Sequence, residues 1–214
     1  MNILAIQELE IPEIKIIRFA KFNDERGYLT EIYNENDFEK YCDFLKNYKF
    51  KQVNETFSLK NTFRGLHFQF KPPMGKLVRL IYGKLFDFAL DLRPHSHTYK
   101  HIVAYEVQST CEFSEWIWLP PGFAHGAWLL ENSMIEYFCT ETYNPVSEQT
   151  ISIFSEDINW TKCNPKIITE FSKIDKTTLK IKERDLQAMS IFDWEKVFWK
   201  HRTEPLVYGT VFEI

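Results

Sequence analysis

Short apolar runs separated by turn residues fill the chain from Phe50 to Phe154, which predicts many short β-strands. Two of these runs, Lys76–Ile81 and Lys84–Leu92, flank Tyr82-Gly83 and predict a β-hairpin. In the second run one face is wholly apolar, while the other carries Asp87 and Asp91. Solvent is the expected environment for this carboxylate-bearing face, and a polar cavity is the alternative.

The ends of the chain differ from this β-rich centre. Gly27–Asn34 is expected to be a strand, and Asn36–Tyr48 a helix with Asn36 or Asp37 as its N-cap. The apolar stripe of that helix consists of Phe38, Tyr41, Cys42 and Leu45. After Trp160, Thr161–Lys180 is polar, Phe192–His201 suggests a short helix, and Glu204–Ile214 suggests a last strand.

Composition narrows the class of protein. The 214 residues suit one domain, or one domain with an appendage, and 19 Phe and 10 Tyr favour strands over a helical bundle. A net charge of −4 gives no reason to expect nucleic acid or membrane as a partner. Because the N-terminus lacks a signal peptide and the four cysteines are widely spaced, we expect free thiols, a cytoplasmic location and no zinc site.

Two segments combine polar chemistry with apolar surroundings. FRGLHFQ (residues 63–69) contains Arg64 and His67, and WLPPGFAHG (residues 118–126) contains His125. Burying such groups without partners costs free energy, so they predict a site inside or at the mouth of a β-barrel. Alternation places His67 and Gln69 on one face and Arg64 on the other, unless a twist at Gly65 brings them together.

These strings, together with GKLVRLIYGKLFDFALDLR, YNPVSEQ and the later IKERDLQA, resemble the dTDP-4-dehydrorhamnose 3,5-epimerase family of nucleotide-sugar epimerases. The resemblance runs from about Phe22 to Trp160 and resumes at Ile181–Ala188. It implies an all-β-dominated fold, a cupin-type jelly roll (double-stranded β-helix) with a few short peripheral helices. It also implies a homodimer with strand exchange. We expect a single epimerase domain over residues 1–190, with residues 191–214 as an extension packed on it or at the dimer interface.

The resemblance assigns His67 as the base that removes a proton next to a sugar ketone. From the residue pattern alone, a hydrogen-bonded core histidine is an equally good interpretation of His67. The carboxylate that orients the imidazole is expected to be Asp185 in KERDL, and Asp175 is the alternative because Asp185 requires an insertion. Tyr137 is the implied catalytic acid, and Tyr143 is a second tyrosine that could line the site instead.

Further residues follow from the resemblance. Lys76 is expected to stabilise an enolate, held in place by Asp87. The residues implied to bind the diphosphate are Arg26, reaching from the partner subunit, Arg64 and His125. Those implied to line the site are Glu31, Gln52, Asn54, Tyr143 and Glu148. Glu55 departs from the histidine common in the family.

A metal-dependent cupin is the least favoured reading. His95 and His97 form an H-x-H pair, but they follow an expected loop, and with His101 they are read as surface residues. The matching position at His67 reads His67-Phe68-Gln69, so no metal is expected. The chain has neither a Rossmann nor a P-loop fingerprint, so no cofactor is expected.

The predicted function is epimerisation at C3 and/or C5 of a nucleotide-diphospho-4-keto-6-deoxyhexose. Two alternatives stay open at this point. One is a single-centre epimerase or an epimerase for another nucleotide sugar. The other is a non-catalytic sugar-nucleotide-binding protein on the same fold, for which a base and an acid would have no use.

Overall fold

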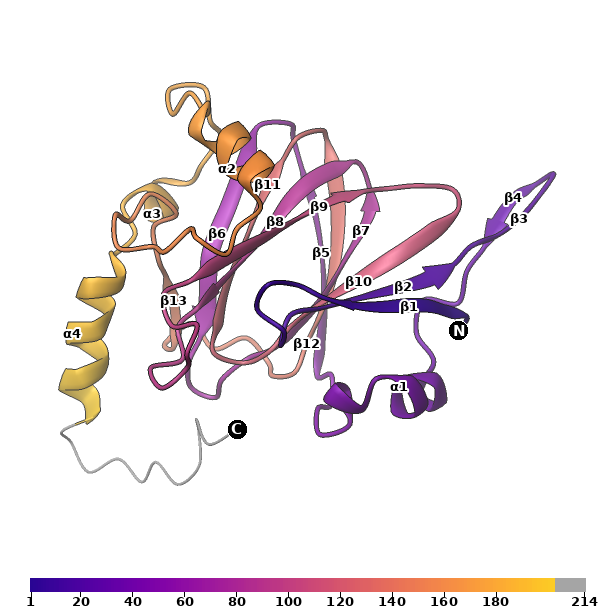
Figure 1. The fold of residues 1–214 in the computed structure, drawn as a ribbon, viewed down its shortest axis with the longest axis horizontal. Coiled ribbons are helices and arrows are strands. Elements are labelled where there is room, and N and C mark those ends of the chain that lie inside the picture. Colours follow the sequence, from indigo (N-terminus) through magenta and orange to yellow (C-terminus); the bar gives the residue numbers. More distant parts are fainter. Residues whose placement is uncertain (203–214) are drawn as a thin grey trace.

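The computed structural model describes residues 1–202 and consists mainly of two antiparallel β-sheets that face each other (Figure 1). The six-stranded sheet has the order β1-β2-β10-β7-β12-β5, the five-stranded sheet has the order β13-β6-β11-β8-β9, and β3–β4 form a separate hairpin. Two facing antiparallel sheets confirm the predicted jelly-roll architecture. The strands are β1 (Ile3–Glu8), β2 (Lys15–Ala20), β3 (Phe22–Asp24), β4 (Gly27–Leu29), β5 (Gln52–Ser58), β6 (Thr62–Gln69), β7 (Lys76–Tyr82), β8 (Lys84–Asp91), β9 (Ile102–Gln108), β10 (Phe113–Leu119), β11 (Phe123–Leu129), β12 (Ser133–Cys139) and β13 (Glu148–Thr150).

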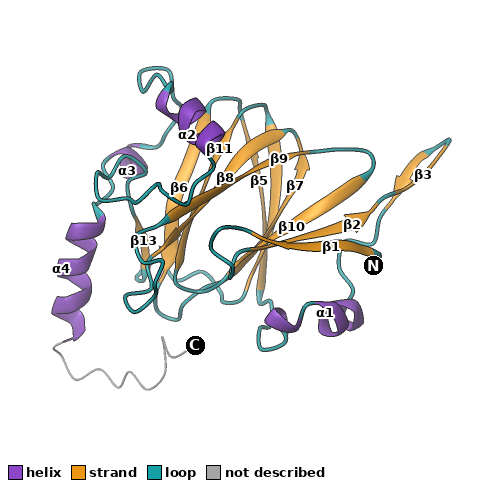
Figure 2. Cartoon of the chain, viewed as in Figure 1, coloured by secondary structure: helices purple, strands orange, loops and turns teal. Residues whose placement is uncertain are grey.

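Short helices lie at the periphery of the sheets (Figure 2). They are α1 (Glu35–Tyr41), the 3₁₀ turn η1 (Asp43–Leu45), α2 (Pro165–Ser172), α3 (Glu183–Leu186) and α4 (Ile191–Arg202). Helices α2, α3 and α4 gather beside β6 and β13, away from α1 (Figure 1). No helix in residues 1–202 is both long and apolar enough to cross a membrane.

The apolar residues form three clusters, one between the sheets and one on each outer face. Val78, Leu85 and Ile117 belong to the cluster between the sheets. Trp116 and Trp118 lie on the other face of β10, which points outward and packs against residues of α1 and η1. Phe88 points out of the five-stranded sheet into the third cluster, which α2 and α4 complete. The facing sheets are thus held by their own inner core, and the helices cover the two outer surfaces.

The predicted hairpin at Tyr82-Gly83 is wrong, although both strands exist. β7 pairs with β10 and β12 in one sheet, while β8 pairs with β9 and β11 in the other. Gly83 has φ +102, and a side chain there would meet Ser133 and Asn132. The glycine therefore turns the chain from one sheet to the other. A two-residue turn between apolar strands does not by itself show whether the strands pair.

The prediction that the carboxylate-bearing face of β8 points to solvent is also wrong. Asp87 and Asp91 are 3% and 0% exposed, because the face they share with Leu85 and Ala89 points between the sheets. The Asp91 carboxylate accepts hydrogen bonds there from Arg93, Ser96 and Thr98. The carboxylates on β8 are interior groups, as in the polar-cavity alternative.

The N-terminal elements are shorter than predicted. The expected strand over Gly27–Asn34 is limited to β4, Gly27–Leu29. The helix begins after Asn34, whose side chain accepts a hydrogen bond from the Asp37 backbone N–H, so neither predicted N-cap is the cap. It ends at Tyr41, which is exposed, and η1 then brings Leu45 into the core.

The polar segment after Trp160 contains a helix that the sequence reading missed. Asn164 caps α2 and Pro165 occupies its first turn, a recognised start signal. Phe171 of α2 stacks on Phe154 and Trp160, so the segment closes the outer face of the five-stranded sheet. The short helix predicted near Phe192 is confirmed as α4. The predicted strand over 204–214 lies outside the described residues, and the predicted division into residues 1–190 and 191–214 stays a prediction.

Candidate active site

A bulge in β6 brings Arg64 and His67 onto the same face. His67 opposes His125 and Arg64 opposes Ala127 in the register with β11, with a shift between the two pairs. Because residues 125 and 127 share a face of β11, their partners share a face of β6, which points between the sheets with Ala127. The bulge requires a glycine at position 65. Its φ is +120, and a Cβ there would lie only 2.5 Å from the Gly126 Cα. Simple alternation, which separated Arg64 from His67, fails at this residue.

His67 is held by a carboxylate from α3. The Asp185 Oδ1 lies 2.8 Å from His67 Nε2, and its Oδ2 accepts a hydrogen bond from the Gly65 backbone N–H. Burial alone would raise the pKa of Asp185, but the hydrogen bond and charge of His67, the Gly65 N–H and the charge of Arg184 together lower that pKa. Asp175, the alternative partner, is exposed and bonds to Thr177 instead. With Nε2–H donated to Asp185, a neutral His67 ring carries its free lone pair on Nδ1.

His125 forms a second histidine–carboxylate pair. Its Nε2 lies 2.8 Å from the Asp87 Oδ2, and the Asp87 side chain is 2% exposed. Asp87 was expected to hold Lys76, but the hydrogen bond it makes is to His125, and only its negative charge acts on Lys76. The sequence reading missed this pairing because β8 and β11 are neighbours only after folding.

Lys76 begins β7 with its side chain in the space between the sheets, beside Val78 on the same face. Burial lowers the pKa of Lys76, and the charges of Cys139, Glu148 and Asp87 partly oppose that fall. The turn before it is fixed by the Gly75 N–H, which donates to Thr140 Oγ1 at 2.8 Å. The ammonium is therefore partly desolvated and close to the acidic groups of the opposite sheet.

Tyr137 lies on β12, in the sheet that faces His67. Its register partners are Asn54 of β5 and Val78 of β7. Burial is the main cause that raises the pKa of Tyr137, while a hydrogen bond with Asn54 and the positive charge of Arg64 oppose it. The phenol is consequently protonated throughout the neutral range and can donate a proton.

Four of the predicted lining residues are connected by hydrogen bonds. Tyr143 donates its backbone N–H to Gln52 Oε1, and Gln52 Nε2 donates to Asn54 Oδ1 at 3.0 Å. The Tyr143 hydroxyl donates to Glu148 at 3.1 Å, and that ring is 52% exposed. Arg64 is also exposed, and its Nε donates to Ser58. Hydrogen bonds thus join Gln52, Asn54, Tyr143 and Glu148 to one another, whereas Arg64 is held separately by Ser58.

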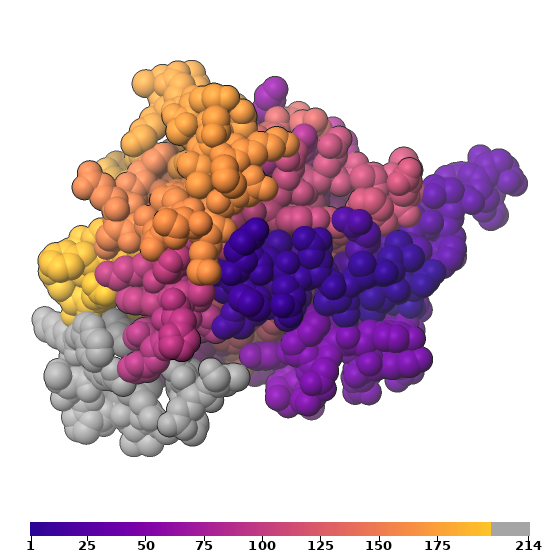
Figure 3. Space-filling model, in the orientation of Figure 1, coloured from indigo at the N-terminus to yellow at the C-terminus, as the bar shows by residue number. Residues whose placement is uncertain are grey.

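Two predicted residues do not join this site within one chain. Arg26 lies at the turn of the β3–β4 hairpin, where it pairs with Asp24, and the hairpin projects away from the body (Figure 3). Glu31 interacts with the amino terminus and with Asn34, and the strand that should have placed it in the site is absent there.

Cys139 is a site residue that the sequence reading missed. It is 1% exposed, opposes both Lys76 and Gln52 in the register, and accepts a hydrogen bond from Asn54 at 3.8 Å. Its position two residues after Tyr137 on the same strand face is the signal that could have found it. Arg184, next to Asp185, was also missed, and it contacts both Asp185 and Glu148.

The other polar clusters do not suggest a metal centre. His95 and His97 are exposed, and His101 bonds to Tyr99 and Asn159, away from the paired histidines. Within residues 1–202, no three His, Cys, Asp or Glu side chains are grouped as metal ligands. The four cysteines are free thiols, as expected.

The arrangement can remove a proton from one face of a carbon atom and return a proton to the opposite face. One sheet supplies an imidazole oriented by a buried carboxylate, and the facing sheet supplies a protonated phenol and an ammonium. The two sides are close, because Arg64 of the sheet that holds His67 donates from its Nε to the Ser58 Oγ of the facing sheet at 2.7 Å. A base and an acid on opposite walls are what inversion of a carbon acid requires.

Comparison with known proteins gives one consistent family. The sequence profile of dTDP-4-dehydrorhamnose 3,5-epimerase matches residues 8–189. The chain is 40% identical over 144 residues to the enzyme of that name from Methanothermobacter thermautotrophicus, covering 67% of this chain and 75% of the relative. It is 39% identical to the one from Sinorhizobium fredii over 171 residues, covering 77% and 84%.

Solved structures agree with the sequence comparison. The crystal structure of dTDP-6-deoxy-D-glucose-3,5-epimerase from Legionella pneumophila, in complex with dTDP-4-keto-L-rhamnose, superposes with a TM-score of 0.75. Its sequence identity is 28%, over 88% of this chain and 93% of that one. The cupin-type fold predicted from the sequence is therefore confirmed.

Proposed function

The chain belongs to the dTDP-4-dehydrorhamnose 3,5-epimerase family of isomerases, and we propose that it inverts C3 and C5 of dTDP-4-keto-6-deoxyglucose during deoxysugar biosynthesis. The observation that carries the proposal is the His67–Asp185 pair on one wall of a space whose other wall holds Tyr137 and Lys76. A protein that only binds a sugar nucleotide has no need of this opposed base and acid.

Proton removal begins the proposed reaction. The C4 ketone acidifies the hydrogens at C3 and C5, and His67 Nδ1 takes one of them while Nε2–H remains bonded to Asp185. The electron pair of the broken C–H bond stays on the sugar and forms the enolate. The imidazole ring of His67 gains the proton and a positive charge. The buried Asp185 carboxylate stabilises that imidazolium and fixes the tautomer that can accept the proton.

Lys76 is the proposed stabiliser of the enolate oxygen. Charge develops on the C4 oxygen as the proton leaves, and a desolvated ammonium interacts with it more strongly than one in water. The negative charges of Asp87 and Glu148 favour the protonated form of Lys76 against the effect of burial on its pKa. The same charges therefore favour the protonated state that this step requires.

Tyr137 completes the inversion by protonating the opposite face of the carbon. Its raised pKa keeps the hydroxyl protonated until the enolate forms. After transfer, the phenolate lies near the positive charge of Arg64 and the hydrogen-bonding amide of Asn54, both of which favour the ionised form. Solvent then returns a proton to Tyr137 and removes one from His67.

The diphosphate is proposed to bind to Arg64 and His125 of one chain and to Arg26 of another. Arg64 is exposed with part of its guanidinium free to donate, and guanidinium groups suit phosphate oxygens. Arg26 can reach the site only from a partner subunit, since its own hairpin projects outward (Figure 3). The exposed apolar residues Phe22, Tyr28 and Leu29 on that hairpin favour a homodimer.

Solvent-deuterium exchange tests this function. Wild-type protein with dTDP-4-keto-6-deoxyglucose in deuterated water should incorporate deuterium at C3 and C5, followed by NMR, and form the epimer. Exchange at one centre only would make the enzyme a single-centre epimerase. Absence of any exchange in a protein that binds dTDP would reject the catalytic proposal.

The variant Tyr137→Phe separates base from acid in the same assay. His67 and Lys76 can still form the enolate, which is then reprotonated from the His67 side or slowly by water. Deuterium should therefore enter substrate that keeps its configuration, while epimer formation falls about 10²-fold or more. Wild-type rates of inversion would remove Tyr137 from the acid role and point to Tyr143; the melting temperature checks that the variant is folded.

A further inference from the structure

Helix α4 begins just beyond the part of the chain that matches the family. The family match ends at residue 189, and α4 runs from Ile191 to Arg202. Ile191 is fully buried and Trp194 is 5% exposed, so the first turn of this helix is part of the protein core. Its N-terminus is tied to Asp157, whose carboxylate accepts hydrogen bonds from the backbone N–H groups of Ile191 and Phe192.

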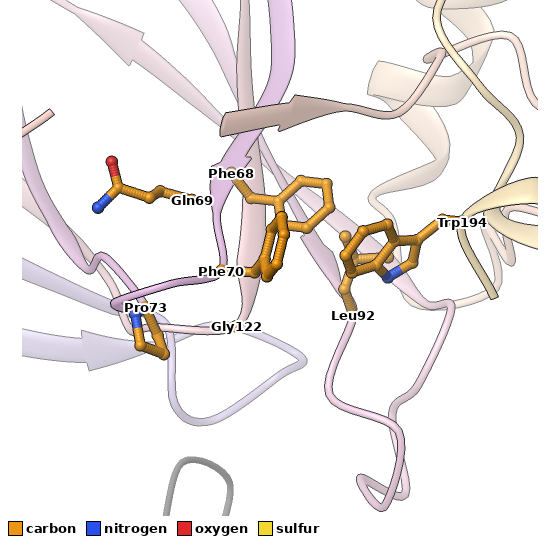
Figure 4. A pocket seen from close by; sticks show the side chains of 7 residues that line it. All are labelled: Phe68, Gln69, Phe70, Pro73, Leu92, Gly122 and Trp194. Carbon is orange, nitrogen blue, oxygen red and sulfur yellow. The ribbon is translucent and has the colours of Figure 1, made fainter. Parts of the chain in front are cut away.

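Trp194 packs directly behind the catalytic strand. Its ring centre lies 4.9 Å from that of Phe68 in an edge-on contact, and 5.2 Å from that of Phe70. Phe68 sits between His67 and Gln69 and points the opposite way. Figure 4 shows Phe68, Phe70 and Trp194 together around a small pocket, with the Gln69 side chain directed away from them. The indole therefore supports the reverse face of β6 at the position of His67.

The carboxylate that orients His67 lies in α3, in the segment that directly precedes α4. Asp185 lies in a strap, residues 180–189, that is pinned at both ends. At the first end Lys180 bridges to Thr62 of β6, and at the second end Met189 bridges to Ile151. The Ser152 N–H also donates to the Met189 carbonyl at 2.9 Å. Helix α4 starts two residues after Met189, so it continues directly from this second end of the strap.

A polar contact holds α4 from the other side. Glu195 accepts a hydrogen bond from the Tyr99 hydroxyl at 3.0 Å and forms an ion pair with Lys100 at 2.9 Å. Tyr99 and Lys100 belong to the loop between β8 and β9, so the helix is clamped between that loop and β6. These contacts leave Phe192 58% exposed on the same helix.

We propose that α4 is a positioning element for the catalytic dyad, with Trp194 as the positioning residue that sets His67 against Asp185. The proposal rests on the function proposed above. Trp194 acts on His67 through Phe68, and α4 acts on Asp185 through Met189 and the strap. Catalytic groups must be held to within about 0.5 Å, and a displacement of about 1 Å can cost a hundredfold in rate. By this proposal, a helix packed on the reverse side of β6 sets the geometry of the dyad inside the site.

The test compares three variants of the full chain. Trp194→Ala should lower kcat about tenfold to a hundredfold while KM changes less than about twofold, because alignment rather than substrate contact is lost. Trp194→Phe should recover most of the rate. Phe192→Ala, on the exposed side of α4, should match wild type.

A ring-tautomer measurement separates positioning from mere stability. In ¹⁵N NMR of the protein with uncharged imidazoles, wild-type His67 should show a proton on Nε2 and a free Nδ1. The variant His67→Ala identifies its signal. Trp194→Ala should mix the two tautomers, and the acidic limb of kcat/KM should move to lower pH as Asp185 disengages from the imidazolium. If Trp194→Ala lowers only the melting temperature, and kcat, the limb and the tautomer stay as in wild type, the proposal is overturned.

Glu195→Gln decides the question if Trp194→Ala does not fold. It removes the ion pair with Lys100 and keeps the indole, so a fall in kcat of about twofold or more, with unchanged KM, supports the clamp. Wild-type kcat and tautomer overturn it. Because the tautomer is read without substrate, failure of the wild type to epimerise would reject the proposed function and leave the positioning test intact.

Discussion

At the scale of single residues, the chemistry is decided by which polar groups pair once the chain is folded. His67 and Asp185 are 118 positions apart and still lie within 2.8 Å, as do His125 and Asp87 from neighbouring strands. A local string can mark His67 as unusual, because an imidazole within an apolar run needs a partner. It cannot name the partner, which explains why Asp87 was assigned to Lys76 instead of His125.

The choice between the two late aspartates gives a direct prediction. Asp185→Asn should lower kcat at least about tenfold, because an amide cannot stabilise the imidazolium or fix the Nδ1 lone pair. Asp175→Asn should stay within about twofold of wild type, since Asp175 is exposed and bonds only within its own turn. Steady-state turnover of the purified variants decides the matter, and the opposite ranking would show that the dyad is assigned to the wrong carboxylate.

The same variant has a stability signature at low pH. The folded pKa of Asp185 lies below its ordinary value, so its contribution is present above about pH 4 and is lost as pH falls through the folded pKa. Asp185→Asn has no such proton to gain. Urea unfolding of wild type between about pH 5 and pH 2 should therefore show the steeper loss of unfolding free energy.

At the scale of elements, period-two patterns predicted the strands well but not their partners. Lys76–Ile81 and Lys84–Leu92 are strands β7 and β8, yet Gly83 sends them to different sheets. Similarly, alternation within β6 holds except at Gly65, where the bulge restores Arg64 to the face of His67. Pairing and bulges depend on contacts with distant strands, here Ser133 and Gly126, which the local pattern does not contain.

The bulge in β6 is expected to be intolerant of a side chain. Gly65→Ala would place a Cβ 2.5 Å from the Gly126 Cα and 2.6 Å from the His125 carbonyl oxygen, and these backbone atoms cannot rotate away. We expect a loss of at least about 2 kcal/mol in unfolding free energy. Activity should fall as well, because His67 and His125 flank the displaced backbone.

Gly27→Ala is the matched control for this variant. Gly27 also has positive φ, +130, but no atom lies within 4 Å of the added Cβ. Only backbone strain of about 1–2 kcal/mol is therefore expected. Urea unfolding of the two variants isolates the steric part. Equal losses would mean that the close approach of β6 and β11 contributes nothing beyond the dihedral angle.

At the scale of the whole molecule, one described chain brings together the proposed base, acid and ammonium but leaves Arg26 outside the site. Its hairpin exposes Phe22, Tyr28 and Leu29 at 54%, 49% and 75%, and a two-stranded hairpin is seldom stable by itself. Edge strand β5 likewise exposes Val53 and Phe57. The sequence resemblance predicted a partner for these surfaces, and no composition or periodicity argument within one chain could have done so.

Sharing of the site between subunits can be tested by complementation. Arg26→Ala and His67→Ala should each be strongly impaired as homodimers. In a mixed dimer, the chain carrying Arg26→Ala keeps His67 and receives Arg26 from its partner, so one of the two sites is whole. Mixed dimers isolated with two different affinity tags should therefore recover about half of wild-type turnover per dimer.

The control for complementation uses a partner that lacks both groups. A mixed dimer of Arg26→Ala with the double variant Arg26→Ala/His67→Ala contains no arginine to donate, and its turnover should stay as low as that of Arg26→Ala alone. If Arg26 acted on the site of its own chain, the first mixed dimer would contain one site without Arg26 and one without His67, and no activity would return. Recovery in the first pair and not in the second therefore requires that the β3–β4 hairpin carry Arg26 into the partner's site.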